Sequence, residues 1–262
     1  MPIWGEKEAG ERGFELPLPL GVSGTMFSQS ANFNVPKVSV GFGDALLKLD
    51  PLIRVGNVKI HETAWTARPD VWVLPFLDVY GIVGQVSGDA DVELRPGFIP
   101  GLRTRGPNVD LKLNYEGPTV GFGGTLAGGF KPIPDRSTIL FGLTDLNFTR
   151  TYLDFHNVVS SLPGVDVIVF SPRLGVRERI VEKSPVGEMY LSLWGGCMYQ
   201  HVEEVMAGSV AGLIDFRADV EAVNPWNTIV GARLEIGRNS VLTVEGGFGD
   251  RKSLMLELTI RF

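Results

Sequence analysis

The stretch Lys252-Ser-Leu-Met-Leu-Glu-Leu-Thr-Ile-Arg-Phe262 alternates apolar and largely polar residues up to a terminal phenylalanine. Side chains of a β-strand point to opposite faces in turn, so this segment has two unlike faces. One face carries Glu257 and Arg261. The other face is entirely apolar and consists of Leu254, Leu256, Leu258, Ile260 and Phe262. The segment therefore predicts a strand that separates an apolar environment from a polar one.

Similar alternation recurs along nearly the whole chain. The sequence predicts extended segments at about 18–28, 55–74, 76–94, 109–130, 138–151, 165–180, 189–205, 226–236, 241–248 and 252–262. Many approach the roughly 9–11 residues that a tilted strand needs to cross a bilayer. Short connections mostly alternate with long ones at 29–54, 95–108, 151–164 and 206–225, as in outer-membrane-type barrels. We predict an all-β, antiparallel up-and-down transmembrane β-barrel of about ten strands, with about twelve as the alternative count.

A soluble β-sandwich or soluble barrel is the competing architecture, because its apolar stripes would form a core instead of facing lipid. Strand length and aromatic residues near predicted strand ends favour the membrane barrel. On this interpretation the apolar stripes within 65–73, 82–94, 109–115 and 226–236 face lipid, and the polar residues between them face the lumen.

Composition excludes several classes of protein. The net charge of −6 offers no basic patch for nucleic acid. The single Cys197 rules out an intramolecular disulfide and a cysteine-based zinc cluster. No apolar run reaches the length of about 18 residues that a transmembrane helix needs. We predict no metal, no cofactor and no nucleic-acid partner.

The chain divides into an N-terminal tail, 1–15, and a barrel domain, 16–262. The tail lacks the apolar run of a secretory signal, so we expect that a signal peptide has already been removed. One short helical turn is predicted at 44–50, before Pro51. This turn and the tail are both candidates for a plug inside the barrel.

The C-terminal segment resembles the assembly signal of Gram-negative outer-membrane barrels through Leu256, Leu258 and Phe262. Ile260 stands where that signal more often has an aromatic residue. Further stretches, at 74–81, 194–200, 225–227 and 246–252, resemble an uncharacterised outer-membrane barrel family. The resemblance implies a bacterial outer-membrane location, contact with the lipid bilayer and lipopolysaccharide, and recognition by the outer-membrane assembly machinery. It implies no biochemical activity.

Charged residues on the predicted inner faces are the candidate functional group, because charges that line a pore set its ion preference. They are Arg68, Asp70, Asp89, Asp91, Asp110, Lys112, Arg173, Arg177, Arg233, Glu235, Glu245, Glu257 and Arg261. The sequence favours a porin-like channel for small solutes with a lumen of mixed charge. A non-conducting structural or adhesion barrel that acts through its long loops is the alternative, since the same charges can fill a lumen with ion pairs.

Two further features bear on the lumen and on catalysis. The inner face of 117–131 is nearly bare of side chains, which indicates close approach by a ligand, by solvent or by another part of the chain. Ser160 and Ser161 near His156 faintly resemble the site of an outer-membrane lipid hydrolase, but their spacing fixes no nucleophile–base geometry. We therefore name no catalytic residue and treat a lipid-modifying enzyme as the least favoured alternative.

Overall fold

The computed structural model describes residues 16–42, 45–48, 53–96, 109–133, 136–155, 164–210 and 214–262. These residues form strands and turns. The strands are β1 Leu20–Phe42, β2 Ala45–Lys48, β3 Ile53–Leu74, β4 Leu77–Pro96, β5 Val109–Phe130, β6 Ile139–Thr151, β7 Asp154–Phe155, β8 Val165–Val181, β9 Met189–Val210, β10 Ile214–Ala222, β11 Trp226–Ile236, β12 Ser240–Phe248 and β13 Lys252–Arg261.

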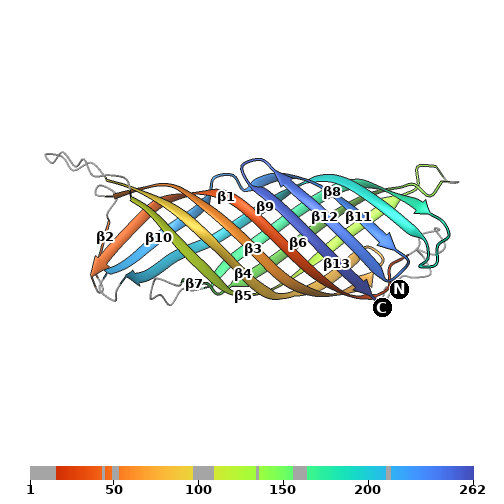
Figure 1. Cartoon of the computed structure of the whole chain (residues 1–262), viewed down its shortest axis with the longest axis horizontal. Coiled ribbons are helices and arrows are strands. Elements are labelled where there is room, and N and C mark those ends of the chain that lie inside the picture. The colour runs from red at the N-terminus through yellow and green to blue at the C-terminus, as the bar shows by residue number, and fades with distance from the viewer. Residues whose placement is uncertain are drawn as a thin grey trace.

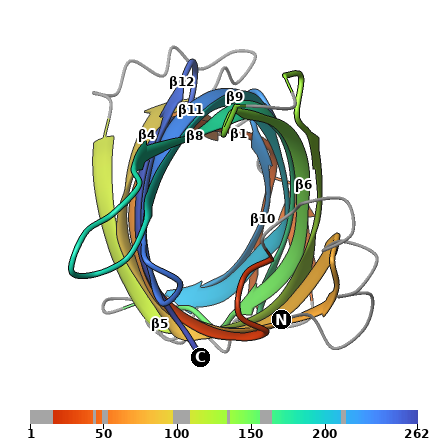
Figure 2. The same ribbon diagram turned by 90° about the vertical axis from the view of Figure 1, so that its right-hand side faces the viewer.

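Ten of these strands form a closed antiparallel ring, in the order β1, β3, β4, β5, β6, β8, β9, β11, β12, β13 and back to β1. The ring closes because β1 pairs on both edges: Gly24 is opposite Leu258 of β13 and opposite Ala67 of β3. Figure 2 shows the ring along its axis. The predicted fold class, an all-β up-and-down barrel of about ten strands, is confirmed.

The barrel has two ends of unlike construction (Figure 1). The first strand and the end of the chain meet at one end, where backbone hydrogen bonds join Leu20 and Phe262 in both directions. The strand-to-strand turns at this end are short, as between β3 and β4 and between β11 and β12. We call this end, which is on the right in Figure 1, the lower end, and the opposite end, on the left, the upper end.

Strand β10 replaces three ring strands toward the upper end. Its Phe216 pairs with Val40 of β1 and with Gly208 of β9. Strands β11, β12 and β13 span only 9 to 11 residues each, so they contribute to the wall only nearer the lower end. The long upper segments of β1 and β9 therefore continue the wall with β10 between them. The sequence did not predict β10.

The segment 44–50 is not helical where it is described. Ala45–Lys48 is strand β2, which pairs with β1 through Phe42 opposite Ala45. The predicted helical turn is therefore wrong at these residues. The other plug candidate, 1–15, lies outside the described residues. The described chain contains no helix long and apolar enough to cross a membrane.

The outside of the wall changes character along the barrel axis. Near the lower end it is apolar, with Trp65 61%, Val83 54% and Leu258 53% exposed. We call this part the lower barrel; it comprises 20–26, 65–74, 77–83, 120–130, 139–151, 165–181, 189–199, 226–236, 240–248 and 252–262. Such a band suits contact with lipid chains. Outward Arg150 and Asp166, whose atoms Nη2 and Oδ2 are 2.5 Å apart, lie at the upper limit of this band.

The upper barrel, formed by 27–42, 53–64, 84–96, 109–119, 200–210 and β10, has the reverse arrangement. Its described outward positions are mostly polar, as at His61, Ser87 and Lys112. Its inner side holds an apolar cluster of buried residues: Ala31, Phe33, Val58, Ile60, Val86, Ala90 and Tyr115. The upper barrel is thus built like a water-soluble barrel, with a hydrophobic interior and a polar exterior.

Candidate functional site in the lumen

A cavity of about 380 Å³ lies inside the barrel and extends through both parts. In the lower barrel its wall includes the charged residues Arg68, Asp145, Arg173, Glu245 and Glu257, together with serine and threonine side chains. In the upper barrel its wall is mostly aliphatic and aromatic. The cavity therefore joins a polar lower region to an apolar region above, which we call the upper chamber.

One ion pair crosses the lower lumen between distant strands. Arg173 on β8 donates from Nε and Nη2 to the two carboxylate oxygens of Glu245 on β12, at 2.6 and 2.9 Å. Strands β9 and β11 separate these two strands in the wall, so the pair bridges over them. The indole nitrogen of Trp194 on β9 also donates to Glu245, at 2.7 Å, and the carboxylate is only 3% exposed. A planar guanidinium bound at two points holds this bridge in a fixed geometry.

A second group of charged residues lies on the opposite side of the lumen. Arg68 on β3 lies 3.4 Å from Glu257 on β13 and 3.9 Å from Asp145 on β6. Its guanidinium carbon is 3.9 Å from the centre of the Tyr80 ring, and the Tyr80 hydroxyl donates to Asp145 at 2.8 Å. These contacts link β13 to β6 over β1, β3, β4 and β5. Together with Arg173 and Glu245, they narrow the lower lumen.

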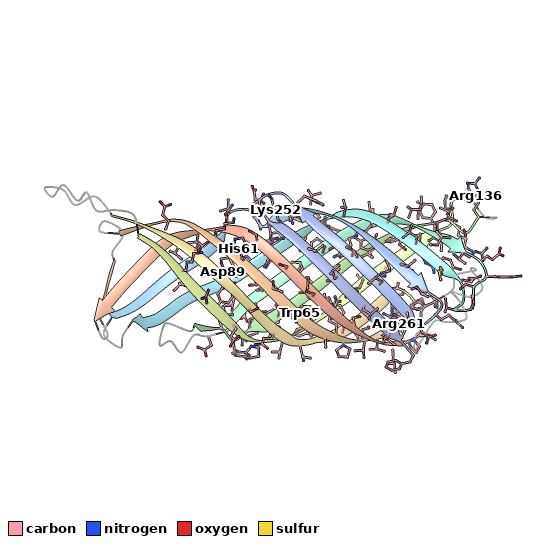
Figure 3. All side chains as sticks on the ribbon, viewed as in Figure 1. His61, Trp65, Asp89, Arg136, Lys252 and Arg261 are labelled. Atoms are coloured by element: carbon pink, nitrogen blue, oxygen red, sulfur yellow. The ribbon has the colours of Figure 1, made fainter. Side chains whose placement is uncertain are left out.

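Two more ion pairs lie closer to the lower end. Arg261 Nη2 is 2.9 Å from Asp70 Oδ2 (the position of Arg261 is labelled in Figure 3). Arg177 Nη2 is 2.7 Å from Glu235 Oε2, and the Arg177 guanidinium carbon lies 3.6 Å from the centre of the Tyr190 ring. The lower lumen therefore contains successive layers of paired charges.

Three carboxylates in the lumen share a recurrent arrangement. An aromatic side chain crosses a glycine on the adjacent strand and donates to a carboxylate one strand further on. Trp194 crosses Gly231 to reach Glu245, and these three residues are in direct register. A Cβ atom added at Gly231 would overlap the Trp194 ring. We call such a set an aromatic–glycine–carboxylate triad.

Two other triads follow the same plan. Tyr80 crosses Gly123, which is opposite it on β5, to reach Asp145 on β6. Tyr115 crosses Gly88, again in direct register, and donates to Glu62 at 3.3 Å. Each glycine is required because a side chain there would occupy the volume of the aromatic ring.

The Glu62 triad lies in the upper chamber and differs from the other two. Glu62 accepts hydrogen bonds from Gln29 Nε2 at 3.2 Å and from Tyr115, and both donors are neutral. Among the described residues, no lysine, arginine or histidine forms an ion pair with it. Burial raises the pKa of the Glu62 carboxyl above its usual value, and the two hydrogen bonds oppose that shift.

Arg251, in the turn between β12 and β13, closes the wall where β10 takes over from the shorter strands. It is 4% exposed and donates to Gln200 Oε1 at 2.5 Å and to the Met198 carbonyl at 3.3 Å. It does not line the main cavity. Its guanidinium therefore belongs to the wall at this junction.

The structure brings most of the predicted lumen residues together. Residues that line the cavity are Arg68, Asp70, Arg173, Arg233, Glu245, Glu257 and Arg261. Arg177 on β8 and Glu235 on β11 point into the barrel nearer the lower end, where they form an ion pair with each other. Asp110 lies in β5 at a level where side chains are outside the described part of the chain.

Three of the predicted lumen residues do not face the lumen. Asp89, Asp91 and Lys112 lie on the outside of the upper barrel, on the face opposite buried Ala90 (Asp89 is labelled in Figure 3). Lys112 Nζ is 3.4 Å from Asp91 Oδ1, and the lysine side chain is 76% exposed. The apolar stripes of 82–94 and 109–115 face the upper chamber where they are described, because the outside of this part is polar.

Three acidic residues of the cavity wall were not predicted from the sequence: Glu62, Asp78 and Asp145. Each lies on the inner face of its strand. Counting every second residue along the strand from Arg68, Tyr80 or Asn147 would therefore have identified them. The bare inner face of 117–131 is explained at Gly123 by the Tyr80 ring of the neighbouring strand. His156, Ser160 and Ser161 lie outside the described residues. No group of three or more potential metal ligands occurs in the described chain.

Comparison with known proteins gives structural likeness only. No family model matches the sequence, and no curated protein matches it. The fold resembles the transport unit of the autotransporter AIDA-I from Escherichia coli, with 8% identity and a TM-score of 0.40, over 93% of this chain and 90% of that one. The outer membrane protein OprG from Pseudomonas aeruginosa gives 11% identity and a TM-score of 0.40, over 94% and 98%.

The Ralstonia pickettii toluene transporter TbuX gives 10% identity and a TM-score of 0.33, over 94% of this chain and 90% of that one. The barrel architecture stands on the chain's own strand pairing.

Proposed function

We propose that this chain is a bacterial outer-membrane barrel that admits small solutes through its lumen. The observation that carries the proposal is the internal cavity of about 380 Å³, whose lower wall is lined by charged residues. A polar interior inside an apolar outer band is the arrangement of barrels that hold water within a bilayer. Lipid and lipopolysaccharide would contact the exposed band, and the outer-membrane assembly machinery would recognise β13 together with the Phe262 that follows it.

The ion pairs of the lower lumen set the width of the proposed path. Arg173 and Glu245 bridge across the wall from one side, and Arg68 with Glu257 and Asp145 from the other. Both bridges consist of side chains, so substitution can widen the lumen without altering the strands. The proposal therefore predicts a small conductance that rises when a bridge is removed.

The test measures single-channel conductance of the purified protein in planar bilayers. We expect discrete steps from the unaltered chain and larger steps from the double variant Arg173→Ala, Glu245→Ala. Removal of both partners avoids leaving one buried charge without its counter-ion. The matched control is Arg150→Ala, Asp166→Ala, which removes an ion pair from the outside of the wall and should leave the conductance unchanged.

A non-conducting structural or adhesion barrel is the second candidate, and the same ion pairs favour it, since they could close the lumen. If the unaltered chain gives no conductance steps but the Arg173, Glu245 double variant does, the result would support this candidate. Absence of conductance steps from both proteins would overturn the conducting function.

A further inference from the structure

The upper chamber contains a carboxylate in an otherwise apolar setting. Glu62 lines the cavity together with Ile60, Val86, Ala90 and Tyr115, which belong to or border the buried apolar cluster. Its two hydrogen-bond donors, Gln29 and Tyr115, are neutral. A carboxylate that is partly buried among apolar side chains is normally stabilised by a cation as well as by hydrogen bonds.

The other two triads show what the Glu62 triad lacks. Asp145 receives the Tyr80 hydroxyl and lies 3.9 Å from the guanidinium of Arg68. Glu245 receives the Trp194 indole and binds Arg173 at two points. Glu62 has the aromatic donor and the crossed glycine, but in the described chain it has no paired arginine. One position in a repeated arrangement therefore remains for a cation.

We propose that the upper chamber binds a compact amphipathic cation, with its ammonium or similar group on Glu62 and its apolar body against the chamber wall. This inference deepens the proposed function by naming the class of solute, and it rests on that function only for the statement that the solute passes on. The chamber wall would take the apolar body by exclusion of water, and Glu62 would select its charge.

The nearby arginine does not make the chamber an anion site. Arg251 is almost fully buried, and it donates to Gln200 Oε1 and the Met198 carbonyl. It lies outside the cavity lining, whereas Glu62 is part of that lining. Among the described residues that line the upper chamber, the charged group available to a ligand is therefore acidic, with Gln29 and Tyr115 beside it.

The test uses three probes with the same apolar body: 2-phenylethylammonium, 2-phenylethanol and 3-phenylpropanoate. Binding to the full chain in lipid nanodiscs is measured by isothermal titration calorimetry. We expect the ammonium probe to bind at least about tenfold more tightly than the alcohol, as a charge-assisted hydrogen bond in a partly buried site provides. The carboxylate probe should bind most weakly.

Glu62→Gln removes the charge and keeps the shape of the side chain. We expect it to reduce ammonium binding about tenfold, to the level of the alcohol, and to leave alcohol binding unchanged. Unchanged alcohol binding also shows that the variant still forms the chamber. Asp89→Asn is the matched control, because Asp89 lies one residue from Gly88, the partner of Glu62, on the outside of the wall; it should bind all three probes as the unaltered chain does.

Equal affinity for the three probes, preference for the carboxylate, or absence of binding would each overturn the inference. So would an ammonium preference that survives Glu62→Gln. Failure of this inference and failure of the proposed function are separate outcomes. Conductance without selective binding removes only the solute class, and selective binding without conductance removes only the channel.

Discussion

At the scale of single residues, the lumen depends on glycines that aromatic rings cross. Gly231 is the clearest case, because the Trp194 ring lies against it and reaches Glu245 on the next strand. The sequence shows glycine there but not its purpose, since the contact depends on the register of three strands. The ion pair of Arg173 with Glu245 was equally unpredictable, because it joins residues 72 positions apart.

Gly231→Ala is therefore expected to destabilise the barrel by about 1–3 kcal/mol, the usual cost of forcing a methyl group into a filled interior. Urea unfolding in lipid vesicles, followed by tryptophan fluorescence, measures the change. Gly195→Ala is the control, because nothing lies within 4 Å of a Cβ atom added there. If the two variants unfold at the same urea concentration, the ring does not need the glycine.

At the scale of strands, the sequence predicted most elements within a few residues but assigned some faces wrongly. Period-two alternation shows which residues share a face, but it does not show what covers that face. The exterior changes from apolar to polar along single strands, so one rule for the whole barrel placed Asp89, Asp91 and Lys112 inside. A signal was present: adjacent apolar pairs, Met26-Phe27 and Ala64-Trp65, mark where the apolar positions shift from one face to the other.

Two outward positions of β4 test this change of exterior. Val83, 54% exposed, belongs to the apolar band, and exposed Ser87 lies four residues further along in the upper barrel. We expect Val83→Arg to destabilise the folded protein by about 1 kcal/mol, because this position lies at the upper limit of the apolar band and not at its middle, and Ser87→Arg to change stability by at most about 0.5 kcal/mol, as measured by unfolding in vesicles. Comparable losses for both variants would contradict the boundary between the two parts.

At the scale of the whole molecule, the charges around the cavity are unequal in number. Its described lining contains six carboxylates, Glu62, Asp70, Asp78, Asp145, Glu245 and Glu257, and four arginines, Arg68, Arg173, Arg233 and Arg261. Mixed charge in the lumen was predictable from the sequence, but the excess of carboxylates was not, because it depends on which faces point inward. An excess of carboxylates lowers the energy of a cation in the lumen.

A conducting barrel should therefore pass K⁺ in preference to Cl⁻. The reversal potential across a bilayer with unequal KCl concentrations measures this preference. It should weaken at high salt, because the screening length falls from about 10 Å at 0.1 M to about 3 Å at 1 M. A reversal potential of the opposite sign would show that the arginines dominate the path.

The seam between β1 and β13 constrains how the molecule can be made. Ser23 and Thr259, whose hydroxyls are 2.8 Å apart across this seam, are 236 positions apart in the sequence. Synthesis must therefore supply the 236 positions between these two residues before β1 can meet β13. Until then two strand edges expose unpaired backbone N–H and C=O groups, which can pair with strands of other chains. Contacts this distant in sequence also slow folding. We therefore expect the nascent polypeptide to need a partner protein or surface that covers these two edges until β1 pairs with β13.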